Sequence, residues 1–173
     1  MLHVVLIAFS LTFIAIQASI VFYTDQDVNY FRGINRNKWS TTGRVTLNFS
    51  VKSCNNARIA LSSNCTGFRP RYVLAIRDKT AIFIRCLETK KCSTIAENST
   101  KDILDCNNQR EFWVSWQNSI LSFGKGFVVE QNVQLTFTMV DTFDIDFIGI
   151  RSLKRAEWTF EVDSRILYSQ FSI

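Results

Sequence analysis

The residues whose types and spacing could do chemistry in this sequence are few, and they exclude catalytic sites that depend on histidine. The only histidine, His3, lies near the start of an apolar N-terminal segment. The rest of the chain therefore has no histidine for a nucleophile–base pair or a metal site. The five cysteines are Cys54, Cys65, Cys86, Cys92 and Cys106. No two of them form a Cys-x-x-Cys pair, so disulfides are favoured over cysteine-bound zinc.

The spacing of the cysteines predicts local disulfides. We expect Cys54 to pair with Cys65, closing a hairpin, and one further pair among Cys86, Cys92 and Cys106. Because the number of cysteines is odd, one thiol is left over within the chain. A disulfide-linked dimer is one hypothesis for that thiol.

Three aspartates form the best cluster of oxygen ligands. Asp144 and Asp146 would point to the same side of a strand, and Asp141 could join them across a turn. Carboxylate oxygens in such a cluster are candidate calcium ligands, and we also consider Asp144 and Asp146 as contacts for a bound ligand. The alternative is a polar turn that uses aspartate as a turn former.

Aromatic residues are concentrated in the segment Arg110–Gly126. Phe112 and Trp116 share one side of a two-residue alternation, which is typical of a strand with two unlike faces. Trp113 falls on the opposite side, so we expect it to be partly exposed and able to stack on a sugar or anchor a partner. Lys125, between two glycines, is another candidate contact. The alternative is that both faces of this strand are covered.

Strand patterns also dominate the rest of the chain. The clearest is 45–51, where apolar residues alternate with polar ones. Further runs are expected at 20–30, 57–61, 72–77, 80–85, 133–140, 145–150, 157–162 and 165–173. We expect 86–105 to be a surface loop with at most one short strand. Because no sustained helical period occurs, the sequence predicts an all-β, jelly-roll-like antiparallel sandwich with cysteine-bearing loops, and with Trp116 and Trp158 in its core.

The N-terminus predicts secretion to the extracellular space. Val4–Ile16 is an uncharged apolar run shorter than a membrane span, so we expect 1–18 to be a signal peptide and 19–173 to be one domain. A retained signal anchor is the alternative, and no later stretch is expected to span a membrane. Asn48-Phe-Ser, Asn64-Cys-Thr and Asn98-Ser-Thr fit the N-glycosylation pattern.

The charge balance is basic, with a formal net charge of +5. Basic residues gather between 69 and 91, where a basic stripe could meet acidic glycans or anionic lipid. The alternative is a solvated strand face that keeps the protein soluble. Nucleic acid is not an expected partner of a secreted chain.

Six short motifs in order resemble one known family. They are Asn56-Ala-Arg-Ile-Ala-Leu-Ser62, Ala81-Ile-Phe-Ile-Arg85, Glu111-Phe-Trp-Val-Ser-Trp116, Phe123-Gly-Lys-Gly126, Phe147-Ile-Gly-Ile150 and Glu157-Trp-Thr-Phe160. Together they resemble the farnesoic acid O-methyltransferase domain of many invertebrate proteins, over about 45–162. The resemblance implies a β-sandwich with lectin-like recognition roles, and the family name implies methyl transfer from S-adenosylmethionine.

These observations favour a secreted, non-enzymatic recognition module that binds carbohydrate or an extracellular protein without a cofactor. The only Gly-x-Gly, Gly124-Lys-Gly126, lies in a β-rich region with no helix after it, unlike the glycine-rich turn of doubly wound cofactor-binding folds. Two alternatives stay open. One is an S-adenosylmethionine-dependent farnesoic acid O-methyltransferase, and the other is a disulfide-linked structural protein.

Overall fold

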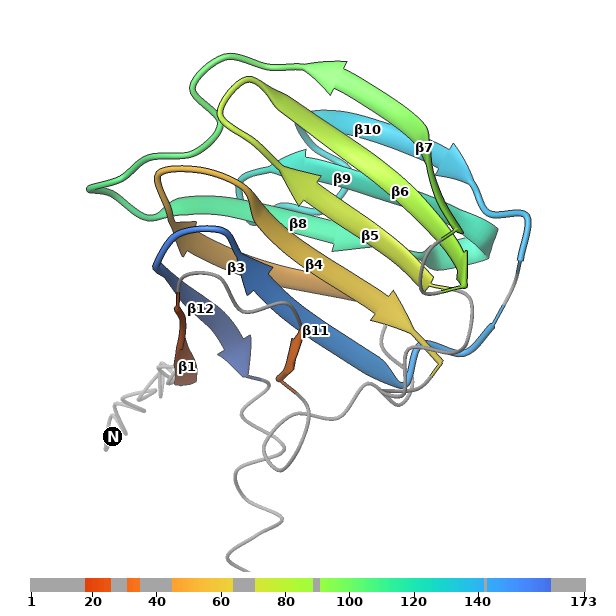
Figure 1. The fold of residues 1–173 in the computed structure, drawn as a ribbon, viewed down its shortest axis with the longest axis horizontal. Helices are drawn as coiled ribbons and strands as arrows, with labels where there is room; N and C mark the ends of the chain where they lie inside the picture. The colour runs from red at the N-terminus through yellow and green to blue at the C-terminus, as the bar shows by residue number, and fades with distance from the viewer. Residues whose placement is uncertain are drawn as a thin grey trace, which may run out of the picture.

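The computed structural model describes residues 18–25, 31–34, 45–63, 71–88, 91–141 and 143–162. Over these ranges the chain forms two antiparallel sheets of six strands each, stacked as a β-sandwich (Figure 1). The predicted fold class is therefore confirmed. The predicted leader up to residue 17, Asn64, Cys65 and the strand expected at 165–173 lie outside the described residues.

The first sheet, sheet A, has the strand order β1-β12-β3-β8-β9-β10. These strands are β1 (Ala18–Thr24), β12 (Ala156–Val162), β3 (Thr46–Lys52), β8 (Arg110–Ser115), β9 (Ile120–Lys125) and β10 (Val133–Thr138). One 3-10 turn, η1 (Gln117–Ser119), joins β8 to β9.

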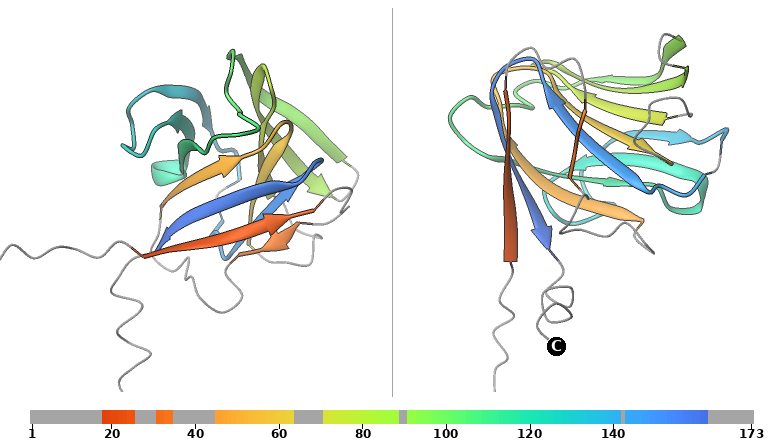
Figure 2. Two further views of the ribbon diagram at one scale, coloured as in Figure 1. Left: turned by 90° about the vertical axis from the view of Figure 1, so that its left-hand side faces the viewer. Right: turned by 60° about the horizontal axis from the view of Figure 1, so that its bottom comes forward.

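The second sheet, sheet B, has the order β2-β11-β4-β5-β6-β7. Its strands are β2 (Arg32–Gly33), β11 (Phe147–Ser152), β4 (Ala57–Ser62), β5 (Arg71–Ile76), β6 (Thr80–Glu88) and β7 (Lys91–Ser99). The edge strands β1 and β2 lie at the same side of the sandwich (Figure 2). Arg32 of β2 joins the two edges, because its Nη1 donates to the carbonyl of Tyr23 at 2.9 Å.

The core lies between the sheets and is built from the inward-facing residues that the alternation predicts. Phe49 of β3 is fully buried, and its ring centroid lies 5.6 Å from Phe112 and 6.1 Å from Trp158. Burial of such large apolar side chains is the main favourable term in folding, at about 1.5–3 kcal/mol for each fully buried side chain. Trp116 and Trp158 are both buried, as predicted.

Two segments differ from the sequence-based expectation. The stretch 86–105, expected to be mostly loop, contains the nine-residue strand β7. Most of this edge strand is exposed, so its side chains carry no apolar alternation, and its backbone pairing with β6 holds it in place. The other difference is at residue 145, where a strand was expected to start. The strand β11 begins only at Phe147, so Asp144 and Asp146 precede it.

The disulfides differ from the predicted pairing. Cys54 is bonded to Cys106, and Cys86 to Cys92. The expected Cys54–Cys65 bridge is therefore wrong. The expected pair among Cys86, Cys92 and Cys106 is confirmed. The reason is the pairing of β3 with β8, which brings the chain leaving β3 beside the chain entering β8. The Ser53 amide donates to the Asp105 carbonyl at 2.9 Å across the same junction.

Candidate functional site

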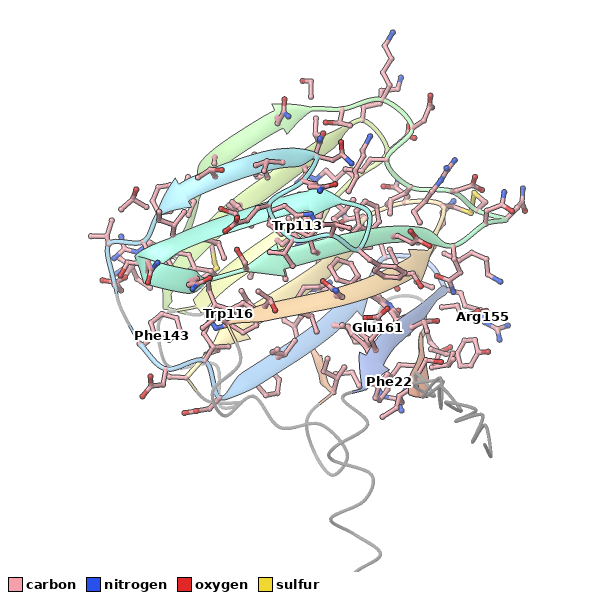
Figure 3. The ribbon with its side chains drawn as sticks, turned by 180° about the vertical axis from the view of Figure 1, so that it is seen from behind. Phe22, Trp113, Trp116, Phe143, Arg155 and Glu161 are labelled. Carbon is pink, nitrogen blue, oxygen red and sulfur yellow. A yellow bond between two sulfur atoms is a disulfide. The ribbon has the colours of Figure 1, made fainter. Side chains whose placement is uncertain are left out.

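Trp113 points away from the core, as its place in the alternation predicts, but it is not exposed. Its exposed fraction is 0%, and its Nε1 donates to the Gln131 carbonyl at 2.9 Å. The loop at 126–132, between β9 and β10, folds back over this part of sheet A, and Figure 3 looks onto that face. The prediction that Trp113 is an exposed ligand contact is therefore wrong. The alternative stated from the sequence, a strand covered on both faces, is correct.

Gly124 makes the burial of this indole possible. It lies directly opposite Trp113 in the β8–β9 pair. A Cβ at this position would lie 2.5 Å from the indole ring, well inside van der Waals contact. The absence of a side chain at Gly124 thus lets the indole lie across the neighbouring strand.

The other predicted contact residues are not brought together. Lys125 is the last residue of β9 and lies near the start of β10, because Val133 pairs with Gly124. The segment that carries Asp144 and Asp146 follows the other end of β10. Asp141 instead accepts hydrogen bonds from the Arg85 guanidinium, with Nε at 2.7 Å. No group of three carboxylate, histidine or cysteine side chains suited to a metal exists among the described residues, so the structure does not gather the three aspartates into the expected cluster of ligands.

Two of the glycan acceptors lie within the described residues. Asn98 is exposed on β7, and its Nδ2 donates to the Gln134 carbonyl at 2.8 Å. Asn48 lies on the outer face of sheet A as expected, but its Nδ2 donates to the Phe127 carbonyl at 3.0 Å under the same loop that covers Trp113. Asn48 is thus less accessible than the alternation suggests. Glycosylation at each acceptor stays a prediction.

A different part of sheet A presents an open pocket. Tyr23 of β1 lies opposite Glu157 of β12, and Glu157 lies opposite Lys52 of β3. Since opposed residues share a face, the three side chains form one row across three strands. They line a cavity of about 310 Å³, the tyrosine pocket, together with Arg155 and the Cys54–Cys106 disulfide.

The polar side of the tyrosine pocket is held in a defined arrangement. Glu157 accepts hydrogen bonds from Lys52 Nζ and from Gln109 Nε2, each at 3.0 Å. The hydrogen bond from Lys52, followed by that from Gln109, holds the pKa of Glu157 below its usual range. Glu157 is therefore a carboxylate at neutral pH, with both of its oxygens engaged.

The loop that supplies Gln109 is ordered by a carboxylate of its own. Asp105 Oδ1 accepts from the backbone N–H groups of Asn107 and Asn108, at 2.8 and 3.1 Å. Arg110 Nη2 donates to the other oxygen of Asp105 at 3.0 Å. The backbone hydrogen bond from Asn107, followed by those from Asn108, lowers the pKa of Asp105, so this turn is held by a charged carboxylate.

The aromatic side of the pocket is open to solvent. Tyr23 is 46% exposed, although it belongs to a strand paired along its full length. The Arg155 guanidinium carbon lies 5.7 Å from the centroid of the Tyr23 ring, a cation–π distance that restrains the ring. Arg155 stands at the edge of the sheet in Figure 3, away from Trp113.

A smaller cavity adjoins the tyrosine pocket at the open side of the sandwich. This edge pocket has a volume of about 200 Å³ and shares Tyr23 with its larger neighbour. Thr24 and Ser152 lie in its lining, with their hydroxyl oxygens 2.5 Å apart. Trp158 Nε1 donates to Thr24 Oγ1 at 3.0 Å, which ties the edge pocket to the core. Arg32 and Arg151 add positive charge to the same lining.

The chemistry of the tyrosine pocket suits binding more than catalysis. An exposed phenol ring, a carboxylate and an ammonium group together offer an apolar face, an acceptor and a donor. Glu157 is the one carboxylate among the described residues that line this pocket. Glycoside hydrolysis by the usual route needs two carboxyl groups about the bond to be cleaved, and this lining supplies one.

The sequence-based search missed every main residue of this pocket. The strict alternation around Trp158 already indicated that Glu157 faces away from the core. What it could not indicate was the pairing of β12 with β1 on one side and with β3 on the other. Tyr23 had no signal beyond its place in a short mixed segment.

The family of this chain follows from comparison with known proteins. A family model described as farnesoic acid O-methyl transferase matches residues 24–165, and the chain belongs to this family. The match begins at the end of β1 and so reaches farther toward the N-terminus than the motifs alone. A comparison with curated proteins gives no match. Among the described residues, no helix is long and apolar enough to cross a membrane.

Comparison with solved structures finds similar proteins at low sequence identity. The galectin LEC-6 of Caenorhabditis elegans aligns with a TM-score of 0.52 and 9% identity, over 83% of this chain and 96% of the galectin. The carbohydrate-binding module CBM66 of Bacillus subtilis aligns with a TM-score of 0.47 and 14% identity, over 67% of this chain and 70% of that module. Sheep galectin-11 aligns with a TM-score of 0.48 and 8% identity, over 78% of this chain and 93% of that galectin. The likeness to LEC-6 establishes a common fold.

Proposed function

We propose that this protein is a secreted, non-enzymatic recognition module that binds carbohydrate through the tyrosine pocket. The observation that carries the proposal is the row Tyr23–Glu157–Lys52, in which an exposed aromatic ring lies beside a hydrogen-bonded ion pair. A sugar ring has an apolar C–H face and a rim of hydroxyl groups. The phenol ring of Tyr23 can stack on the apolar face, and the ion pair can form hydrogen bonds with the hydroxyl groups.

The pocket is suited to this ligand in size and in rigidity. Its volume of about 310 Å³ lies at the lower end of the range for small-ligand sites, roughly 300–1,000 Å³. The hydrogen bonds from Lys52 and Gln109 to Glu157 orient the polar groups before any ligand arrives. Less side-chain entropy is then lost on binding than in a mobile site.

Secretion is supported by the cysteines and by the N-terminal sequence. Two disulfides are typical of proteins that fold in an oxidising compartment. The apolar segment Val4–Ile16 has the length expected of a signal peptide. The sandwich shared with a galectin is compatible with sugar binding, while the pocket residues provide the argument for it.

A glycan array tests the proposal directly. The wild type, Tyr23→Ala and Glu157→Gln are compared, with Glu111→Gln as the control, because Glu111 is an exposed carboxylate of the same sheet outside the pocket. We expect saturable binding of a related set of glycans that falls at least about tenfold in both pocket variants and stays unchanged in the control.

A blank array from well-folded protein would refute carbohydrate binding and direct the search to protein partners. The same would follow if Glu111→Gln reduced binding as much as Glu157→Gln does. Calorimetric titration with S-adenosylmethionine tests the activity implied by the family name. Measurable affinity there would favour the methyltransferase over the recognition module.

A further inference from the structure

The strand β1 has one edge that no other described strand covers. It lies at the end of sheet A and pairs on one side only, with β12 (Figure 2). Proteins usually protect an edge strand with a charge, a proline or a bulge, because its free backbone groups can pair with another chain. The seven residues of β1 contain no charge and no proline, and their register with β12 is continuous. This edge is therefore a candidate interaction surface.

The other three edge strands of the described sheets are short or joined to each other. β2 has only two residues. β7 and β10, at the opposite ends of the two sheets, are linked by side chains. Asn98 Nδ2 donates to the Gln134 carbonyl at 2.8 Å, and Thr100 Oγ1 donates to Gln134 Oε1 at 3.0 Å. Among these edges, only that of β1 is both long and open.

The backbone groups that face the open edge can be identified. Arg32 of β2 donates to the Tyr23 carbonyl, so this carbonyl points away from β12. Successive residues of a strand direct their N–H and C=O groups to alternate edges, so the backbone of Val21 faces the open edge as well. The rest of sheet A agrees with this assignment. The Trp116 N–H donates to the Val45 carbonyl, and the same alternation continues through β3 and β12 to β1.

The outer face of β1 suits a second copy of the same strand. Full antiparallel overlap of two β1 strands places Val21, the middle residue, opposite itself and Ser19 opposite Tyr23. Val21 and Tyr23 are each 46% exposed, so both have surface left to bury. A formal net charge of +5 opposes self-association, but two copies of this uncharged strand meet without a contact between like charges.

The inner face of β1 suits a second copy for a similar reason. Ile20 and Phe22 pack against the core but are only partly buried at this edge of the sheet. In the same overlap, Ile20 of one copy is opposite Phe22 of the other on the core side. Apolar side chains opposite each other on neighbouring strands cover one another. The contact then uses the same patch on both molecules, as twofold symmetry requires.

We propose that β1 pairs with β1 of a second copy, so that two molecules share one continuous antiparallel sheet. The Val21 residues of the two copies form the central pair, and each N–H donates to the other carbonyl. This pairing needs no glycan and so goes beyond the proposed function. It also places the two tyrosine pockets on one face of the shared sheet, where a ligand with repeated sugars can engage both.

Sedimentation velocity over about 1 to 200 μM protein, with no glycan present, measures the association. We expect a reversible equilibrium between monomer and dimer. Val21→Pro removes the central N–H donor and should raise the dissociation constant at least about tenfold. In the monomer this N–H faces no described strand, so the variant should still fold, as circular dichroism checks.

Three further variants make the test specific. Val21→Lys keeps the N–H but places two like charges opposite each other, so it should weaken the dimer at least about tenfold. It carries the comparison if Val21→Pro does not fold. Val140→Lys changes an exposed apolar residue outside β1 and should alter the dissociation constant less than about twofold. Cys65→Ser removes the one cysteine outside the two disulfides and should leave the dimer intact.

A monomer at every concentration, or a dimer that both Val21 variants leave unchanged, would overturn the inference. A dimer lost in Cys65→Ser would show that a thiol joins the two copies, and would overturn it as well. The proposed function fails separately, if the glycan array is blank for a protein that still dimerises.

Discussion

Two aromatic side chains on the outer face of sheet A have opposite surroundings. Trp113, on the central strand β8, is completely buried under the loop at 126–132, and its N–H is bonded to the carbonyl of Gln131. Tyr23, on the edge strand β1, is 46% exposed and lines two cavities. The comparison teaches that an outward-facing aromatic residue becomes a binding group only where the chain leaves it uncovered. The alternation of residues along a strand indicates on which side of the sheet a side chain lies. It does not indicate whether another part of the chain covers that side chain.

The strongest test of this contrast is to truncate both aromatic residues. Trp113→Ala should lower the free energy of unfolding by about 3–5 kcal/mol, because a buried indole and its hydrogen bond are lost. Tyr23→Ala should lower it by less than about 1 kcal/mol, since half of that side chain already contacts water. Urea denaturation measures both. A cost for Tyr23→Ala as large as that for Trp113→Ala would remove the distinction between a structural and a binding aromatic residue.

A second variant sharpens the account of how Trp113 is buried. Gly124→Ala places a Cβ where the indole lies, so it should lower the free energy of unfolding by about 1–3 kcal/mol. Ser122→Ala, two residues earlier on the same face of β9, is the matched control and should have little effect. In a double-mutant cycle, the cost of Gly124→Ala should nearly vanish when Trp113 is alanine. An unchanged cost would show that the clash is not with the indole.

The smallest expected effect is the pH dependence of the tyrosine pocket. Because the folded-state pKa of Glu157 is lowered, its stabilising contribution is present above the ordinary carboxyl pKa. That contribution is lost as the pH falls through the lowered value. In Glu157→Gln the free energy of unfolding should therefore decline less steeply between about pH 5 and pH 2 than in the wild type. The effect is modest because the ion pair is partly exposed.

Asp105 provides the internal comparison for this measurement. Its pKa is lowered in the same direction, and it is retained in the Glu157→Gln protein. Part of the acid dependence should thus remain in the variant. Identical curves for the two proteins would mean that Glu157 is not held as a charged acceptor in the folded state, and would weaken the case for the polar side of the pocket.

Much of the fold could be predicted because a strand leaves a local signal. Apolar and polar residues alternate in β3, and Phe49 is in the core as that pattern requires. The same rule placed Trp116 and Trp158 correctly. It failed for β7, an exposed edge strand whose place depends on backbone bonds to β6. Local patterns thus predict strands that bury one face and miss those that bury neither.

The sequence by itself determined the fold class, the family and the side on which most core residues lie. Each of these properties can be inferred from patterns among residues that lie within a few positions of one another along the chain. Only the tertiary structure decided that Cys54 meets Cys106, that a loop covers Trp113, and that Tyr23 stands beside Glu157. The physical reason is that strand order and register join residues far apart in the chain, and no local periodicity carries that information.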